Sequence, residues 1–144
     1  MLDTQQPAAS TLLFSFLDIF FVVFHTTLIL FNLLGWIWKK TRVWNLVVLL
    51  LTGSSWLFLG LIVGTLGYCP LTEWHFRILE KLGHHDLPNS YIKYLADRLS
   101  GLDINAVFVN DITLYAFLGV LVVSVLMNLL QVPFNGFRGK KAGS

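Results

Sequence analysis

Residues 11–38 read TLLFSFLDIFFVVFHTTLILFNLLGWIW, an apolar run that only Asp18, His25 and Asn32 interrupt with strongly polar side chains. A helix of this length is about 42 Å long, which exceeds the roughly 30 Å hydrocarbon core of a membrane. No Lys or Arg precedes the run, and it is far longer than the core of a cleaved signal peptide. We therefore expect it to form a membrane-spanning helix.

Two further apolar runs, residues 43–66 and 105–132, are also long enough to span a membrane. The composition agrees, because 56% of the 144 residues are hydrophobic and 12% are charged, whereas soluble domains carry about 25% charged residues. This composition and a net charge of +2 exclude a nucleic-acid binder and an ordinary soluble enzyme. The sequence predicts one all-α integral membrane domain, residues 1–144, with three transmembrane helices in the lipid bilayer.

Positive charge gathers on one side of the predicted spans. Lys39, Lys40 and Arg42 fill the connection between the first two spans, and three cations follow the third span: Arg138, Lys140 and Lys141. By the positive-inside rule both segments are cytoplasmic. We then expect the N-terminus and residues 67–104 on the outer side of the membrane and the C-terminus in the cytoplasm.

Residues 67–104 are too polar to span and are expected to form two short amphipathic helices. The first begins after Pro70, with Thr72 as its N-cap. The second begins at Asn89 or Ser90, ends at Gly101, and carries one apolar face made of Ile92, Leu95 and Leu99. Such helices lie in the outer interface and can cover the end of a bundle.

Asp18, His25 and Asn32 are spaced by seven residues, so they share one stripe of the first predicted helix. A polar stripe inside a membrane faces protein or water rather than lipid, because charge is costly there. Together with Asn128 of the third span, the stripe predicts a polar pocket. By depth in the membrane, Asn32 can contact Asn45 or Asn128, and His25 can contact Ser54, Ser55 or Ser124.

Two interpretations of this pocket stay open. The polar side chains can hold the helices together by hydrogen bonds, or His25 can bind a proton, a metal ion or haem. A bis-histidine haem would need a ligand from another chain, because the spans hold no second histidine. The cofactor is therefore left unknown, with metal and haem as candidates.

The second span and its outer end carry four glycines that would share one smooth helix-packing face: Gly53, Gly60, Gly64 and Gly67. Gly60 and Gly64 form a GxxxG pair, which permits close contact with another helix. That helix can be the third span near Ala116 and Gly119, or a helix of a partner. Three spans have few internal faces, so we expect other membrane-protein subunits or a homo-oligomer.

The outer end of the second span carries a cluster of reactive and capping residues: Cys69, Pro70, Leu71, Thr72, Glu73 and His75. Cys69 and His75 are potential metal ligands, but their spacing matches no standard zinc clip. As a nucleophile, Cys69 would use His75 or Glu73 as its base. The alternative is a structural turn before a capped helix. No standard catalytic motif occurs, so no catalytic residue is assigned.

Several of these residues form a pattern that resembles a known family. Asp18 and His25 lie in the first span, Phe31 and Gly35 follow, Cys-Pro-Leu-Thr occupies residues 69–72, and the last span holds Asn128. The pattern is similar to that of the bacterial integral membrane proteins called domain of unknown function 2784, over residues 11–131. The resemblance implies a small bacterial inner-membrane protein and implies no reaction.

Three functions compete at this point. The first is an accessory or assembly subunit of a larger membrane complex, favoured by the small size and the glycine face. The second is a small ligand-, metal- or proton-binding membrane protein that uses the pocket of Asp18 and His25. The third is a membrane enzyme at the outer interface, built on Cys69, Glu73 and His75. Enzyme activity is the least favoured of the three.

Overall fold

The computed structural model describes residues 7–138 and the side chains of residues 7–131. Within these residues the protein is all-α and contains no strand. The helices, in chain order, are α1 (Ala8–Leu34), α2 (Arg42–Ser54), the π-helix η1 (Ser55–Leu59), α3 (Gly60–Val63), α4 (Pro70–Lys81), α5 (Tyr91–Ser100) and α6 (Ala106–Arg138).

Three helical segments are long and apolar enough to cross a membrane: α1, the continuous segment Arg42–Val63 formed by α2, η1 and α3, and residues Ala106–Gln131 of α6. Two short helices, α4 and α5, lie between the second and third spans. Most large apolar side chains of the spans are exposed, as expected for surfaces that contact lipid. The predicted three-span membrane fold is confirmed.

Two spans end earlier than the apolar runs suggest. α1 stops at Leu34 instead of residue 38, and the chain then turns, with Thr41 Oγ1 donating to Gly35 O at 2.6 Å. The second span stops at Val63 instead of residue 66, because Gly64 takes a left-handed φ of 81° that closes the helix.

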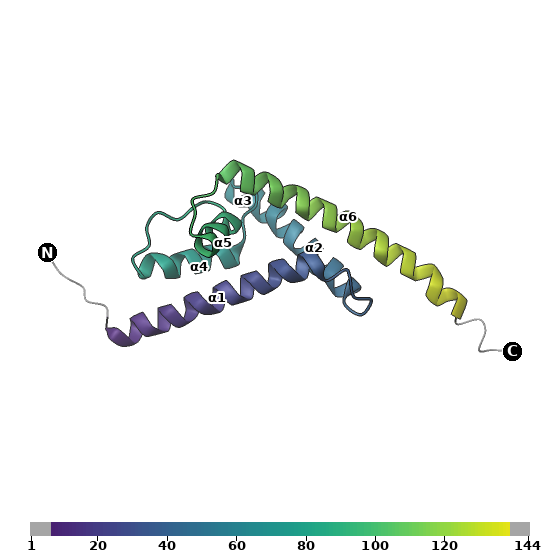
Figure 1. The fold of residues 1–144 in the computed structure, drawn as a ribbon, viewed down its shortest axis with the longest axis horizontal. Coiled ribbons are helices and arrows are strands. Elements are labelled where there is room, and N and C mark those ends of the chain that lie inside the picture. Colours follow the sequence, from purple (N-terminus) through teal and green to yellow (C-terminus); the bar gives the residue numbers. More distant parts are fainter. Residues whose placement is uncertain (1–6, 139–144) are drawn as a thin grey trace.

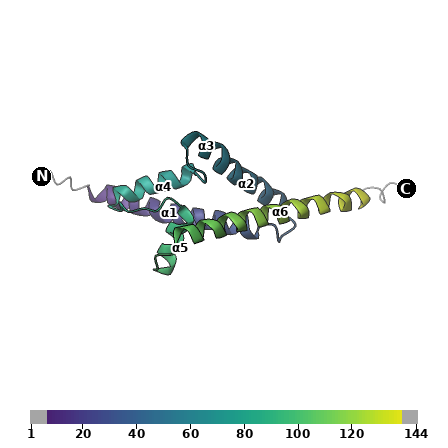
Figure 2. The ribbon, with the colours of Figure 1, turned by 90° about the horizontal axis from the view of Figure 1, so that it is seen from above.

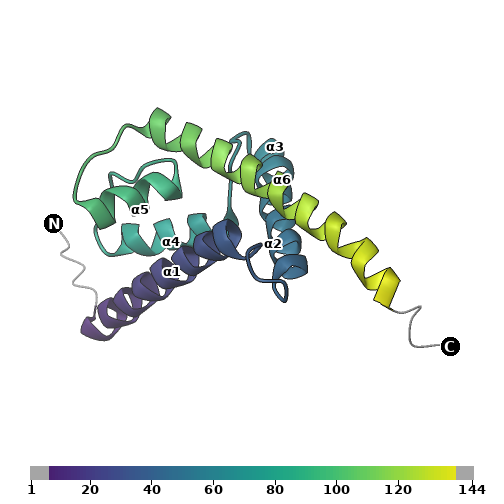
Figure 3. The ribbon, with the colours of Figure 1, turned by 45° about the vertical axis from the view of Figure 1, so that its right-hand side comes forward.

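The helices meet in two buried regions (Figure 1). A tight turn joins α1 to α2, and α6 packs against α2 and α1. α4 runs beside the N-terminal half of α1, and α5 lies between α4 and the beginning of α6 (Figure 3). The C-terminal part of α6 extends past the turn between α1 and α2, most plainly in Figure 2. One buried region thus joins the three spans, and the other joins α1 to α4 and α5.

The region between the spans is polar and centres on Asn45, which is fully buried. Its Nδ2 donates to Phe31 O at 2.7 Å and to Asn32 O at 3.1 Å, and its Oδ1 accepts from Ser124 Oγ at 2.9 Å. Gly35 makes room for this amide, because a Cβ at Gly35 would lie 2.9 Å from Asn45 Nδ2. One side chain therefore ties α1, α2 and α6 together.

The predicted glycine face is not formed. Gly64 and Gly67 have φ values of 81° and 86°, so they belong to a left-handed turn and not to a helix. A Cβ at Gly60 would lie 2.8 Å from Thr65 O, so this glycine lets the turn fold back over its own helix. Gly53 does face the third span, where a Cβ would lie 3.1 Å from the ring of Phe117.

The two short helices predicted within residues 67–104 form as α4 and α5, with two local differences. Cys69 and not Thr72 occupies the N-cap position of α4, because Pro70 already has helical geometry as the first residue. Ser90 caps α5 and Gly101 ends it with a φ of 72°. The buried face of α5 is made of Tyr91 and Leu95, whereas the predicted Leu99 is 71% exposed.

Candidate functional site

A series of hydrogen bonds between three side chains joins α1 to α4 and α5. His75 of α4 is fully buried. Its Nε2 lies 2.8 Å from Asp18 Oδ1 of α1, and its Nδ1 lies 2.9 Å from the hydroxyl of Tyr91 of α5. The contact arises because α4 turns the face that carries His75 and Leu79 inward against α1. A carboxylate, an imidazole and a phenol are thus linked in series.

Arg98 balances the charge of Asp18. Its Nη1 donates to Asp18 Oδ1 at 2.7 Å and its Nη2 to Oδ2 at 2.9 Å, which is the bidentate geometry that guanidinium groups favour with carboxylates. Arg98 also donates to the hydroxyl of Tyr94, one turn earlier in α5. The hydrogen bond to Asp18 raises the pKa of Arg98, so the pair stays ionised but carries no net charge.

The neighbours of His75 determine where its proton lies. Burial lowers the pKa of His75 and outweighs the hydrogen bond to Asp18, so the ring is neutral at pH 7. An ionised carboxylate only accepts, so Nε2 of His75 carries the proton and donates to Asp18. Nδ1 is then an acceptor for the hydroxyl of Tyr91. Burial also raises the pKa of Tyr91, which keeps the phenol protonated and able to donate.

His25 of α1 lies next to the hydrogen-bonded side chains, on the side of Tyr91. Its ring packs on the ring of Tyr91, with centroids 4.0 Å apart, and its Nδ1 lies 3.3 Å from Phe21 O. A carbonyl oxygen only accepts, so Nδ1 carries the proton and Nε2 presents a lone pair. Nε2 is buried and has no hydrogen-bond partner within the described residues. The inner end of the site is therefore an unfilled hydrogen-bond acceptor.

Lys93 fixes the position of α5 relative to α6. Its Nζ donates to Asp97 and Asp103, each at 2.6 Å, and to Ile104 O at 2.7 Å. The hydrogen bonds to Asp103 and Asp97 raise the pKa of Lys93, so its ammonium group is charged at neutral pH. The loop that follows α5 is thereby held against the helix that carries Tyr91 and Arg98.

A family described as Protein of Unknown function (DUF2784) matches residues 15–129. The chain belongs to this family. The resemblance inferred from the sequence is confirmed, and the residues matched to DUF2784 span the whole site, from Asp18 to Arg98. No curated protein and no solved structure matches the chain.

The structure divides the predicted polar pocket into two separate groups. Asp18 and His25 belong to the site at the outer helices, and His25 contacts Tyr91 instead of a serine. Asn32 and Asn128 belong to the network between the spans. Asn32 Nδ2 donates to Thr52 Oγ1 at 3.3 Å, and Asn128 Nδ2 donates to Arg42 O at 3.2 Å.

The outer cluster is also divided. His75 turns inward to Asp18, whereas Glu73 turns outward and accepts from Arg77 Nε at 3.0 Å. Cys69 is half-buried, and no hydrogen bond links its thiol to either residue in the described part of the chain. Residues 7–131 hold no group of three or more His, Cys, Asp or Glu side chains placed to bind a metal ion. The same cluster therefore contributes one residue, His75, to the site.

Three residues of the site lie outside the sequence-based prediction: Tyr91, Tyr94 and Arg98. Their spacing of three and four residues places them on one face of α5. An acid inside a membrane span requires a cation or a donor nearby. A search of the outer helices for a cation that shares a face with aromatic hydroxyls would have selected Arg98 as the partner of Asp18.

Proposed function

We propose that this member of DUF2784 is a proton-binding membrane protein whose site is the chain of Asp18, His75 and Tyr91. The observation that carries the proposal is the position of His75, whose two ring nitrogens both bond to ionisable side chains. An imidazole in this position can take a proton at one nitrogen and release one at the other. This deepens the second of the three functions that the sequence left open.

The exposure of the site gives the proton a direction of travel. The Asp18 side chain is 14% exposed and that of Arg98 is 38% exposed, whereas His75 is fully buried. The phenolic proton of Tyr91 can pass to His75 Nδ1 while Nε2 gives its proton to Asp18, and the tyrosinate that remains takes up a new proton before the next transfer. Asp18 then exchanges the proton that it received with water. Because burial raises the pKa of Tyr91, the phenol gives up its proton only when a second proton replaces it.

The other two functions have weaker support. The accessory-subunit hypothesis drew on the small size of the protein and on a glycine face, and Gly64 and Gly67 form a turn instead of that face. The enzyme hypothesis depended on Cys69 acting with His75 or Glu73, and both residues bond elsewhere. The proton-binding function needs only contacts that are present between described residues.

We extend the proposal to the placement of the protein in a bacterial cytoplasmic membrane. Lys39 and Lys40 lie in the turn between α1 and α2, at the opposite end of α1 from Asp18. The positive-inside rule then assigns the turn to the cytoplasm and the proton-binding site to the outer side. Lys140 and Lys141 lie outside the described residues and add to this argument through the sequence alone.

The proposal is tested by nitrogen NMR of the histidine-labelled protein in lipid nanodiscs over a range of pH. The signal that His75→Gln removes belongs to His75. We expect His75 to protonate below the ordinary histidine pKa of about 6.5, and Asp18→Asn to lower its midpoint further, because a carboxylate stabilises the imidazolium.

Asp86→Asn is the matched control, because it removes an exposed acid of the loop between α4 and α5. It should leave the His75 midpoint unchanged. A midpoint for His75 that Asp18→Asn and Asp86→Asn affect equally would show that the two groups do not act as one site, and the proposal would be wrong.

A further inference from the structure

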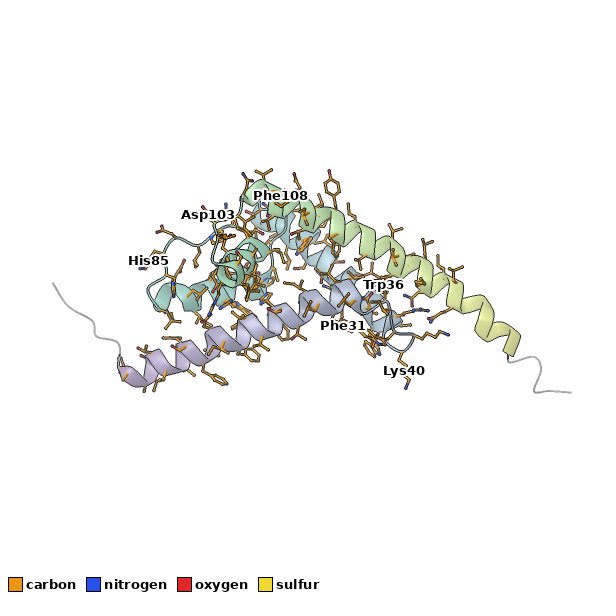
Figure 4. The ribbon with its side chains drawn as sticks, in the orientation of Figure 1. Phe31, Trp36, Lys40, His85, Asp103 and Phe108 are labelled. Atoms are coloured by element: carbon orange, nitrogen blue, oxygen red, sulfur yellow. The ribbon has the colours of Figure 1, made fainter. Side chains whose placement is uncertain are left out.

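The turn between α1 and α2 is rigid and cationic. Thr41 Oγ1 donates to Gly35 O and to Trp38 O, at 2.6 and 3.1 Å, and Arg42 Nε donates to Trp36 O at 2.8 Å. These bonds fix the backbone that carries Lys39 and Lys40. Both lysines are exposed, and Figure 4 shows Lys40 at the tip of the turn, pointing away from the helices.

The two lysines differ from most cations at the other end of the protein. Arg77, Lys93 and Arg98 each form an ion pair with at least one acid, and Lys81 lies over the ring of Phe14. Within residues 7–131, Lys39 and Lys40 form no ion pair. Residues 132–144 contain no Asp or Glu, and the one acid before residue 7, Asp3, precedes the beginning of α1, whereas the turn follows its end. The positive charge of the turn is therefore left for an anion from outside the chain.

The surroundings of the turn fit the membrane interface. Trp38 and Trp44 are 59% and 67% exposed on either side of the lysines. Exposed tryptophans with adjacent lysines are typical of the headgroup level of a bilayer. An anion that reaches Lys39 and Lys40 at this level comes from the lipid leaflet.

An apolar groove lies farther along the same helix. Its volume is about 210 Å³, and its walls come from α2, η1 and α6: Leu49, Leu50, Gly53, Ser54, Leu57, Phe58 and Leu121. The groove begins seven residues after Arg42, which is about 10 Å along a helix. The near end of the groove lies within the leaflet next to the turn, because half of the hydrocarbon core is about 15 Å thick. Its far end at Phe58, about 24 Å along the helix from Arg42, extends past the middle of the core. An acyl chain whose headgroup lies at the turn can reach it.

We infer that the protein binds an anionic phospholipid, with the headgroup phosphate at Lys39 and Lys40 and an acyl chain in the groove. The charge at one end and the apolar walls at the other match the two parts of such a lipid. Loss of each lysine should weaken binding about fivefold, since a basic residue near an anionic surface contributes about that factor. This inference does not depend on the proton-binding function, because the two sites share no residue.

The test measures lipids that stay bound when the protein is released from nanodiscs that contain phosphatidylglycerol and phosphatidylcholine in equal amounts. Native mass spectrometry should find phosphatidylglycerol retained in preference to phosphatidylcholine. The double variant K39Q/K40Q should lose this preference. The double variant R77Q/K81Q, which removes the same charge at the other end, should keep it. Equal retention of the two lipids by the unmodified protein would overturn the inference, as would an unchanged preference in K39Q/K40Q.

A second variant tests the groove separately. Ser54 is exposed and contributes the only polar side chain of the groove wall, so Ser54→Phe fills the groove without removing a buried contact. We expect Ser54→Phe to reduce retained phosphatidylglycerol several-fold while its helical circular dichroism stays unchanged. Full retention in this variant would overturn the assignment of the acyl chain to the groove.

Discussion

Arg98 is the residue on which the charge balance of the site depends. Without it, Asp18 would keep a negative charge inside a membrane span with only His75 as a partner. Removing one member of a buried ion pair costs about 3–5 kcal/mol. Because the Arg98 side chain is 38% exposed, we expect Arg98→Gln to destabilise the protein by a smaller amount, about 2 kcal/mol.

Arg77→Gln is the matched control for this prediction. Arg77 and Glu73 form an exposed ion pair on α4, with side chains that are 68% and 40% exposed. Such pairs contribute at most about 1 kcal/mol. Thermal unfolding in nanodiscs compares the two variants, and equal losses would show that the contact between Arg98 and Asp18 does not stabilise the fold.

His75 gives the stability of the protein a dependence on pH. Since burial lowers the pKa of His75, the folded protein takes up this proton less readily than the unfolded chain. The stabilisation is present above the ordinary pKa of about 6.5 and decreases as the pH falls below it. We expect the unfolding temperature to fall from pH 7 to pH 5, and to fall less in His75→Gln. The same decrease in both proteins would assign the effect to other groups.

Among the elements, α1 depends on a glycine at its C-terminal end. A Cβ at Gly35 would lie 2.6 Å from Phe31 O and 2.9 Å from Asn45 Nδ2, and Asn45 has no room to move because it is fully buried. We expect Gly35→Ala to destabilise the protein by about 2 kcal/mol. Gly119→Ala is the control, because a Cβ there meets no atom within 4 Å. A neutral Gly35→Ala would contradict the packing of the turn.

The elements also show what the sequence could predict. Hydropathy predicted all three spans, because each run is longer than the membrane core, and turn residues such as Ser90 and Gly101 predicted the ends of α5. The spacing of glycines led to a wrong face on the second span. The positive φ of Gly64 and Gly67 depends on a chain reversal, and helical spacing alone does not distinguish a packing glycine from a turn glycine.

For the whole molecule, the contacts that build the site join distant parts of the chain. Asp18 is 57 residues from His75 and 80 residues from Arg98. The sequence selected Asp18, His25 and His75 by residue type, but it placed His75 with Cys69 and His25 with the serines of other spans. These pairings were wrong because α4 packs against α1, and the periodicity of a helix does not identify which helix it will contact.

The proposed function depends on a neutral His75 that donates to Asp18 and accepts from Tyr91. The positions of these protons can be measured in the nitrogen spectrum of His75 at pH 7, with the protein labelled at its histidines and held in nanodiscs. The structure predicts a neutral ring with its proton on Nε2, and a Nδ1 signal that shifts in Tyr91→Phe because the hydrogen bond from the phenol is lost. A proton on Nδ1, or a charged ring at pH 7, would contradict the account.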